Sequence, residues 1–398
     1  MNQYIKRNLI ALWSAQTISQ AGDAIYQFAL MWLVLDMTNS PIITGLIAMS
    51  AYLPALILGL FAGVLSDRLN RYFLMIGAHV SQSLTVIAIP VLIYFDLATG
   101  LFIGIIAFIR SGFSTFFQPA FNAFVPTLFP TNQLVRVNSI LVTSGQIAYI
   151  LGPALAGVLL AIVSLPNLFL IDGLSFLVAI AFLTIVVKPQ QDIIESPHGH
   201  WDELVEGLNY IKTTKPLFVL MIITFFNNIF IMGPAIVGVP ILVRNALNGT
   251  ASDFAFVEAC MAGGSLLGSI IVTRLNKYLS NGLIWTIGMI LDGITYSIFF
   301  FSESVPMVMV MIFIHGIGIP FIIVSRTVII QQIAPNLLHG RLFSMVHLGV
   351  VGMTALSSAA VGFSAAFFSI KSIFLFIGVG ATICGIIGMS LNYIREIE

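Results

Sequence analysis

Four polar residues recur along the first long apolar segment of the chain, and one of them is an acid. They follow one another at intervals of four, three and four residues, so one face of a helix carries Gln16, Gln20, Asp23 and Gln27. Lipid does not accept such a row, so this face must contact other helices or water. Hydrogen bonding between helices is one interpretation. The acid at mid-depth favours the other, a polar cavity in which Asp23 exchanges a proton.

A basic residue stands at a similar depth in the fourth apolar segment. Arg110 lies about ten residues from the outer end of that segment, and Ser114 and Gln118 share its helical face. A pair between Asp23 and Arg110 would avoid the cost of burying either charge alone. The pair either takes part in proton coupling or only holds the first half together, and the sequence leaves both interpretations open.

Three more ionisable residues lie in apolar segments of the second half of the chain. Glu258, His315 and Arg326 join Asp23 and Arg110 as candidates for proton coupling or for the wall of a cavity, and Glu258 is the alternative proton carrier. The candidate substrate-lining residues are polar or aromatic: Gln16, Gln20, Gln27, Gln118, Phe225 and Phe226. The histidines are scattered over segments and depths without a nucleophile or a cysteine cluster. The sequence therefore predicts neither an enzyme, nor a metal site, nor a cofactor.

The composition indicates that membrane helices position these residues. Charged residues make up 8% and hydrophobic residues 59% of the 398 residues, whereas soluble domains carry about 25% charged residues. A membrane-spanning helix needs about 20 mostly apolar residues. The sequence thus predicts an all-α polytopic membrane protein with twelve spans: 8–35, 41–66, 71–95, 99–127, 138–163, 166–187, 217–243, 251–273, 281–301, 305–331, 342–369 and 371–394. The formal net charge is zero, and without a basic stripe nucleic acid is not an expected partner.

The chain repeats itself at about half its length. The segment from Asp67 to Arg71 aligns with Thr273 to Lys277, 206 residues later, and Arg136 aligns with Arg341, 205 residues later. Such a long repeat indicates two copies of a membrane half. We expect two pseudo-symmetric six-helix halves, 1–187 and 217–398, joined by a cytoplasmic linker, 188–216. The linker is expected to contain an amphipathic helix, because five apolar residues recur in it at helical spacing: Trp201, Leu204, Val205, Leu208 and Ile211.

Basic residues indicate the orientation in the membrane. If the N-terminus is cytoplasmic, the inner segments hold twelve lysines and arginines, whereas the outer loops hold only Arg244 and Lys371. Because basic residues gather on the cytoplasmic side, both termini are predicted to be cytoplasmic.

Three stretches of the sequence resemble motifs of the major facilitator superfamily. The segment from Gly63 to Arg71 resembles its loop 2–3 signature, Gly-x-x-x-Asp-Arg-x-x-Arg, and the matching residues form the expected gating motif: Gly63, Asp67, Arg68 and Arg71. Arg110 occupies the place of the fourth-span arginine of drug exporters. The fifth segment resembles the antiporter motif at Gly152, Pro153 and Gly157, although two of its usual glycines are Ala148 and Ala156.

Two short segments are similar to the macrolide-efflux branch of that superfamily: Phe108 to Ser111 and Gly340 to Ser344. That branch itself resembles siderophore exporters. The resemblance implies proton-coupled export of a small amphiphilic, drug-like compound by alternating access, with the proton gradient as energy source. A siderophore or lipid-like metabolite is the alternative substrate. The compact loops indicate a bacterial inner membrane, and a monomer is expected. Spans 3, 6, 9 and 12 support the cavity from outside in this fold, so His79, Asp172 and Asp292 are expected to be structural.

Overall fold

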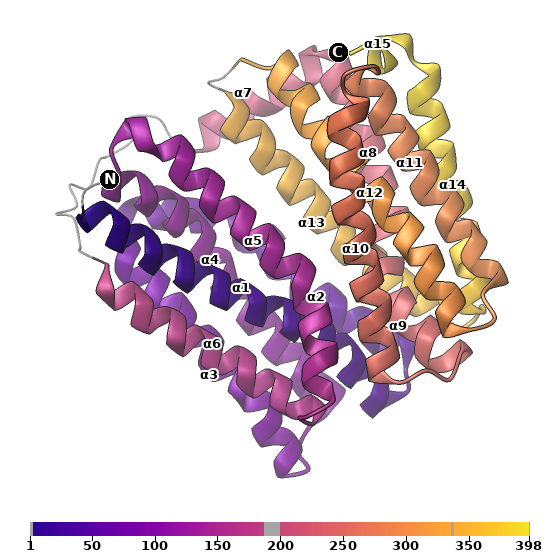
Figure 1. Cartoon of the computed structure of the whole chain (residues 1–398), viewed down its shortest axis with the longest axis horizontal. Helices are drawn as coiled ribbons and strands as arrows, with labels where there is room; N and C mark the ends of the chain where they lie inside the picture. The colour runs from indigo at the N-terminus through magenta and orange to yellow at the C-terminus, as the bar shows by residue number, and fades with distance from the viewer. Residues whose placement is uncertain (1–2, 187–199, 336–337, 398) are drawn as a thin grey trace. The chain divides into compact units, whose positions relative to one another are not determined.

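The computed structural model describes residues 3–186, 200–335 and 338–397, and these residues form helices without a strand (Figure 1). Six long helices account for the first half of the chain: α1 (Gln3–Thr38), α2 (Pro41–Arg68), α3 (Arg71–Tyr94), α4 (Gly100–Leu128), α5 (Thr131–Leu160) and α6 (Leu165–Ile185). Each corresponds to one predicted span. The largest difference is at the start of α5, which begins at Thr131 rather than at residue 138.

The second half contains the remaining elements: α7 (His200–Thr213), α8 (Lys215–Gly233), η1 (Pro234–Gly238), α9 (Val239–Ile241), η2 (Leu242–Ala246), α10 (Ala251–Leu275), α11 (Asn281–Ile298), η3 (Phe299–Phe301), α12 (Val305–Ile333), α13 (His339–Ser364), α14 (Ile370–Ser390) and α15 (Asn392–Arg395). The segment from α8 to η2 is one rod that accounts for the seventh predicted span. It is interrupted by two π-helical turns, η1 and η2. Proline interrupts the regular α-helical hydrogen bonding because it lacks an N–H, and this rod contains both Pro234 and Pro240.

Ten helical segments among the described residues are long and apolar enough to cross a membrane. The other two predicted spans are α1 and α5. The polar row of α1 lowers the hydropathy of that helix. In α5 the described side chains include a shorter apolar stretch, Leu151–Leu160. Helices α4, α8, α10 and α12, which carry Arg110, Phe225, Glu258 and His315, are therefore apolar enough to cross a membrane, whereas α1 carries the predicted polar face.

The chain divides into two compact units. The first unit comprises residues 1–39 and 50–197, and the second comprises residues 40–49 and 198–398. The start of α2 belongs to the second unit because it packs closely on α13. A Cβ atom at Gly45 would lie 2.6 Å from the carbonyl oxygen of Ser358 and 2.8 Å from the Cα of Gly362, so this approach requires glycine.

The predicted linker helix is α7, which belongs to the second unit. Its Ile211 is buried, its Glu206 forms an ion pair with Arg341 of α13, and the hydroxyl of Tyr210 donates to the carbonyl of Ile333 at 3.1 Å. These contacts fix α7 against the second unit. Residues 188–199 of the predicted linker and the side chains of Trp201 and Leu204 lie outside the described residues.

The internal repeat is reproduced in the lengths of the helices. Helices α4 and α12 both have 29 residues, and α6 and α14 both have 21. In both pairs the second helix begins 205 residues after the first. Arg110 of α4 and His315 of α12 therefore occupy equivalent positions in the two halves.

Candidate functional site

The first unit buries an arginine between two acids. Arg110 of α4 donates through Nη2 to Oδ1 of Asp23 on α1, as the sequence predicts, and also to Oδ2 of Asp172 on α6 at 3.1 Å. Figure 1 shows that α1 lies beside α5 and α6, and α1 also contacts α4. The three charged side chains, which we call the Arg110 cluster, therefore join three helices of one unit.

Aromatic rings complete the surroundings of the guanidinium. Its Cζ lies 3.7 Å from the centroid of the Tyr26 ring and 5.5 Å from that of Phe176. A planar guanidinium stacks on such rings and still donates in its own plane, which an ammonium does not do. Arg110 is thus held by two opposite charges and by the face of Tyr26.

The two acids of the Arg110 cluster differ in their access to the surface. The side chain of Asp172 is 0% exposed and that of Arg110 is 5% exposed, whereas that of Asp23 is 36% exposed. With both acids ionised, the cluster carries one net negative charge. Burial disfavours uncompensated charge, and one bound proton makes the cluster neutral. The arrangement can therefore bind a proton, and Asp23 is the acid that the surface reaches.

Several polar atoms of the Arg110 cluster are buried without a hydrogen-bond partner among the described residues. They are Nε of Arg110, Oδ1 of Asp172 and the hydroxyl of Tyr26. An unpaired buried polar atom costs about 1–3 kcal/mol, so native structures retain few of them. Their concentration around one charge marks this region as polar rather than as ordinary packing.

Small residues on α1 and its neighbours allow the two acids to approach Arg110 together. A Cβ atom at Gly22 would lie 2.6 Å from Oδ1 of Asp172, so glycine lets α6 bring its acid beside Asp23. On another side, Gly152 of α5 packs directly on Ala24. Asp23 is thus flanked by two positions, Gly22 and Ala24, at which a neighbouring helix approaches α1 closely.

This contact indicates that Gly152, in the segment that resembles the antiporter motif, allows α5 to pack closely on α1. For the transport activity that the resemblance implies, we expect Gly152→Leu to reduce the rate to background, because any side chain at 152 displaces α1 at Ala24 and moves the neighbouring Asp23. Ala154→Leu, at a partly buried position of the same helix, should retain most of the rate. The measurement is the initial transport rate at matched amounts of protein in the membrane. Equal losses in both variants would assign the effect to general packing of α5.

Among the described residues, the candidate substrate-lining side chains form no hydrogen bond with the charged groups of the Arg110 cluster. Gln16 is buried, and Gln20 packs against Gly145 of α5. Gln27 is partly buried, whereas Gln118 is exposed and donates to Asn122 of its own helix at 2.8 Å. In the second unit, Phe225 packs against Gly349 of α13, and Phe226 is exposed. These residues remain candidates for substrate contact, whereas the predicted pair of Asp23 and Arg110 is present as an ion pair.

The candidates of the second unit lie on α10 and α12. His315 of α12 is buried next to Asp292 of α11, whereas Glu258 of α10 and Arg326 of α12 are partly buried. Arg326 has no acidic partner among the residues that the structure describes. A partly buried cation without a counter-charge is available to an anionic ligand.

The expected gating motif joins three helices. Arg71 donates to the carbonyl of Ser66 at the end of α2 and, at 3.1 Å, to the carbonyl of Ala123 in α4. Asn70 caps the start of α3 by accepting from two backbone N–H groups. Arg68 is exposed in the last turn of α2, and a Cβ atom at Gly63 would meet no atom within 4 Å. The side chain of Asp67 lies outside the described residues.

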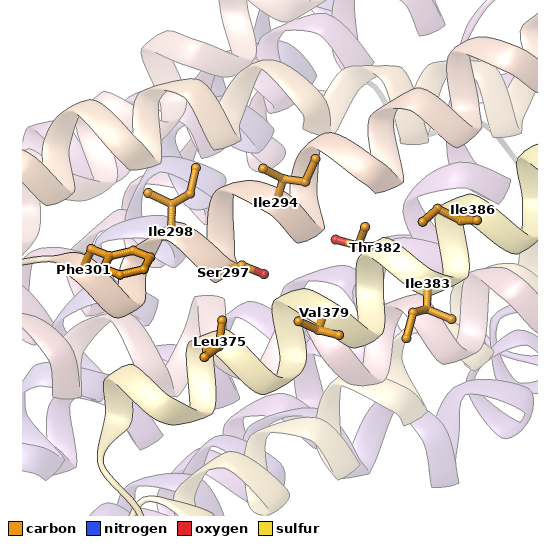
Figure 2. Close-up of a pocket in the computed structure, with 9 residues that line it drawn as sticks. All are labelled: Ile294, Ser297, Ile298, Phe301, Leu375, Val379, Thr382, Ile383 and Ile386. Atoms are coloured by element: carbon orange, nitrogen blue, oxygen red, sulfur yellow. The ribbon is translucent and has the colours of Figure 1, made fainter.

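A shallow hollow between α11 and α14 contains none of the candidate residues (Figure 2). Its volume is about 430 Å³, and it is lined by Ile294, Ser297, Ile298, Phe301, Leu375, Val379, Thr382, Ile383 and Ile386. The hydroxyls of Ser297 and Thr382 donate to carbonyls of their own helices, so they do not require an outside partner. The hollow is an apolar surface feature of two membrane helices.

Two acids of the structure were not expected to take part in charged clusters. Asp172 and Asp292 lie on helices that the resemblance assigns to the supporting ring, yet each contacts a buried basic residue. The available signal was an acid in an otherwise uncharged apolar span. Tyr26, whose ring covers Arg110, has no distinguishing signal in the sequence because tyrosine is common in membrane helices.

The helices form a membrane-protein fold of the major facilitator type. A solved nucleoside transporter, NupG, matches with a TM-score of 0.78 over 98% of this chain and 99% of its own, at 11% identity. This likeness confirms the predicted all-α fold with twelve membrane helices.

Proteins of similar sequence identify the family within this fold class. The chain is 29% identical over 353 residues to macrolide efflux protein A of Streptococcus pyogenes, which covers 85% of each chain. It is 24% identical over 373 residues to the staphyloferrin A transporter of Staphylococcus aureus, covering 91% of this chain and 90% of the relative. The chain belongs to the transmembrane secretion effector family of the major facilitator superfamily, which it matches over residues 4–398. It is therefore an efflux transporter and an integral membrane protein.

Proposed function

We propose that the protein exports a small amphiphilic, macrolide-like compound in exchange for protons. The observation that carries this proposal is the Arg110 cluster, in which one guanidinium faces two carboxylates and one bound proton restores neutrality. Asp23 is the proton carrier because it is the more exposed acid, and Asp172 is the buried counter-charge. The similarity to a protein named for macrolide efflux supports the substrate class.

The proposed cycle uses the membrane potential to load the proton. A proton that enters from outside gains about 2.3 kcal/mol per 100 mV for each charge that crosses. Protonation removes the charge of Asp23 and weakens its hydrogen bond to Arg110, which keeps Asp172 as its partner. The two halves then rock between outward-open and inward-open states, and the gating motif from Gly63 to Arg71 closes the cytoplasmic side. Glu258 is the alternative carrier.

The proposed setting is a bacterial inner membrane, with both termini in the cytoplasm and the protein acting as a monomer. The excess of basic residues in the predicted inner segments supports this orientation. The cycle needs a substrate, protons and a lipid bilayer, and it needs no cofactor.

Export of an anionic siderophore or a lipid-like metabolite is the second candidate function. The similarity to a staphyloferrin A transporter supports it. Arg110 faces two acids and is already compensated, so an anionic substrate would bind at Arg326, which lacks an acidic partner among the described residues.

A substrate panel in proteoliposomes tests both candidates. With an imposed proton gradient, we expect a macrolide or another hydrophobic drug to drive proton movement across the membrane, and ferric or free staphyloferrin-type siderophores to give none. Arg326→Gln should leave drug transport near the wild-type rate. Proton movement with the siderophore alone, lost in Arg326→Gln, would replace the first candidate by the second. No proton movement with any compound would contradict proton coupling.

A further inference from the structure

The second unit contains a buried acid and a buried histidine in contact. Nδ1 of His315 on α12 lies 3.5 Å from Oδ1 of Asp292 on α11 and 3.0 Å from the hydroxyl of Thr295. The imidazole stacks on the ring of Tyr296, with 4.1 Å between the ring centroids. Both titratable side chains are buried, so this is a polar pair inside an apolar helix bundle.

The carboxylate of Asp292 lies against the backbone of α12. A Cβ atom at Gly318 would lie 2.9 Å from Oδ1 of Asp292, so glycine at this position leaves room for the acid. Oδ1 of Asp292 and the hydroxyl of Tyr296 are buried without a hydrogen-bond partner among the described residues. Because this carboxylate oxygen is buried and accepts no hydrogen bond from the described residues, the hydrogen bonding of the pair is incomplete.

Few other charges surround the pair. Glu258 of α10, the helix packed along α12, is within electrostatic range of Tyr296. Helix α14 packs on α11 and presents the ring of Phe374 to Tyr296, whereas its titratable Cys384 lies in an apolar cluster with Trp285 and Met289. No arginine or lysine forms an ion pair with Asp292 in the described ranges.

The charge of the pair depends on one proton. With one proton, the pair is neutral overall, whichever of the two groups holds it. Without a proton it carries a buried negative charge, and with two protons it carries a buried positive charge, and both states are costly away from water. The pair therefore holds one proton while it is buried, and it can exchange that proton only when water reaches it.

His79 of the first unit is a natural contrast. It is also buried, but its ring centroid lies 4.2 Å from that of Phe117 and 5.2 Å from that of Phe176. Neither of its ring nitrogens has a hydrogen-bond partner among the described residues. A buried imidazole without an acid stays neutral. A comparison of the two histidines therefore separates the effect of an adjacent carboxylate on proton binding from the effect of burial alone.

The repeat relates the pair to the Arg110 cluster. His315 occupies the position of Arg110, so each unit places a basic group at the same point of equivalent helices, α4 and α12. The first unit supplies acids from α1 and α6, whereas the second supplies one from α11. Arginine stays charged, but histidine gains and loses a proton near neutral pH.

We infer that Asp292 and His315 form a second proton-binding site, which exchanges one proton with water during the transport cycle. The proton passes from water to the pair on one side of the membrane and returns to water on the other, and no covalent bond other than those to the proton changes. This inference rests on the proposed function, because alternating access is what brings water to the pair.

The test measures proton binding without a substrate. The full-length protein is reconstituted in liposomes on a solid-supported membrane, and the displaced charge is recorded after a rapid change from about pH 8 to about pH 5. The wild type should bind protons at both sites. Asp292→Asn and His315→Gln should each lose about half of the displaced charge, and the double variant should lose no more than either, because the two residues share one proton.

Controls distinguish this site from the Arg110 cluster and from damage to the fold. His79→Gln removes a buried histidine without an acid and should leave the displaced charge unchanged. Asp23→Asn should remove the other half. Wild-type charge in both Asp292→Asn and His315→Gln, with unchanged thermal unfolding, would overturn the inference. Loss in these variants together with no loss in Asp23→Asn would overturn the role of Asp23 and leave the second site standing. If Asp292→Asn fails to fold, His315→Gln alone decides by the same criterion.

Discussion

Asp23→Asn is expected to abolish export against a concentration gradient while it preserves substrate binding and downhill exchange. Asparagine keeps the shape of the side chain and can still accept a hydrogen bond from Arg110, but it cannot bind or release a proton. The cluster then stays neutral throughout the cycle, with Arg110 paired to Asp172 alone. The proton gradient loses its point of entry, so uphill transport should fall to background.

The measurement is accumulation of a transported drug in inverted vesicles, with and without a proton gradient. Asp96→Asn is the matched control, because Asp96 is exposed and has a φ of 56°, a conformation that asparagine also adopts readily. Glu258→Gln should be less severe than Asp23→Asn. Uphill export by Asp23→Asn at the wild-type rate would show that Asp23 is not the carrier and that its row in α1 is structural.

The second large effect concerns stability. Arg110→Gln should destabilise the protein by about 3–5 kcal/mol, because it leaves the carboxylate of Asp172 buried without its counter-charge. Asp172 is the more sensitive acid, since it is fully buried and Asp23 retains contact with the surface. The lost stacking on Tyr26 adds to the effect. Arg110→Lys should be only a partial replacement, because a lysine cannot stack on Tyr26 and donate to both acids in one plane.

A second substitution in the same cluster tests this explanation. Arg110→Gln combined with Asp172→Asn should be more stable than Arg110→Gln alone, because the uncompensated charge is removed. The free energy of unfolding in mixed micelles measures both variants. Arg326→Gln is the control for loss of a partly buried arginine without an acidic partner in the described part of the chain, and it should cost less. Additive losses in the double variant would contradict a charge-based cause.

The sequence predicts the helices well because their boundaries depend on local composition. Apolar runs of sufficient length are separated by short polar loops, and this pattern locates all twelve spans to within a few residues at most ends. The contact between Asp23 and Arg110 was also predictable, because each is a charge at mid-depth that needs a partner. Helical periodicity gives the face on which a residue lies, but it does not give the neighbouring helix.

Asp172 illustrates this limit. It stands seven residues after the start of α6, and Arg110 stands ten residues after the start of α4, so their depths are similar if both helices begin on the same side. The resemblance places α6 among the supporting helices, so it predicts a structural role for this acid. The close approach of α1 and α6 at Gly22 depends on tertiary packing, and one sequence does not reveal which glycine meets which helix.

The rod from Lys215 to Ala246 has a further consequence for how this chain tolerates insertions and deletions. A π-helical turn contains one residue more than an α-helical turn, so η1 and η2 are single-residue expansions of the helix. Removing one residue from such a turn restores α-helical geometry and keeps the flanking parts in phase. Removing one residue elsewhere in the rod would rotate everything beyond it by about 100°. The evolutionary freedom of this helix to change length is therefore concentrated in two short stretches, η1 and η2.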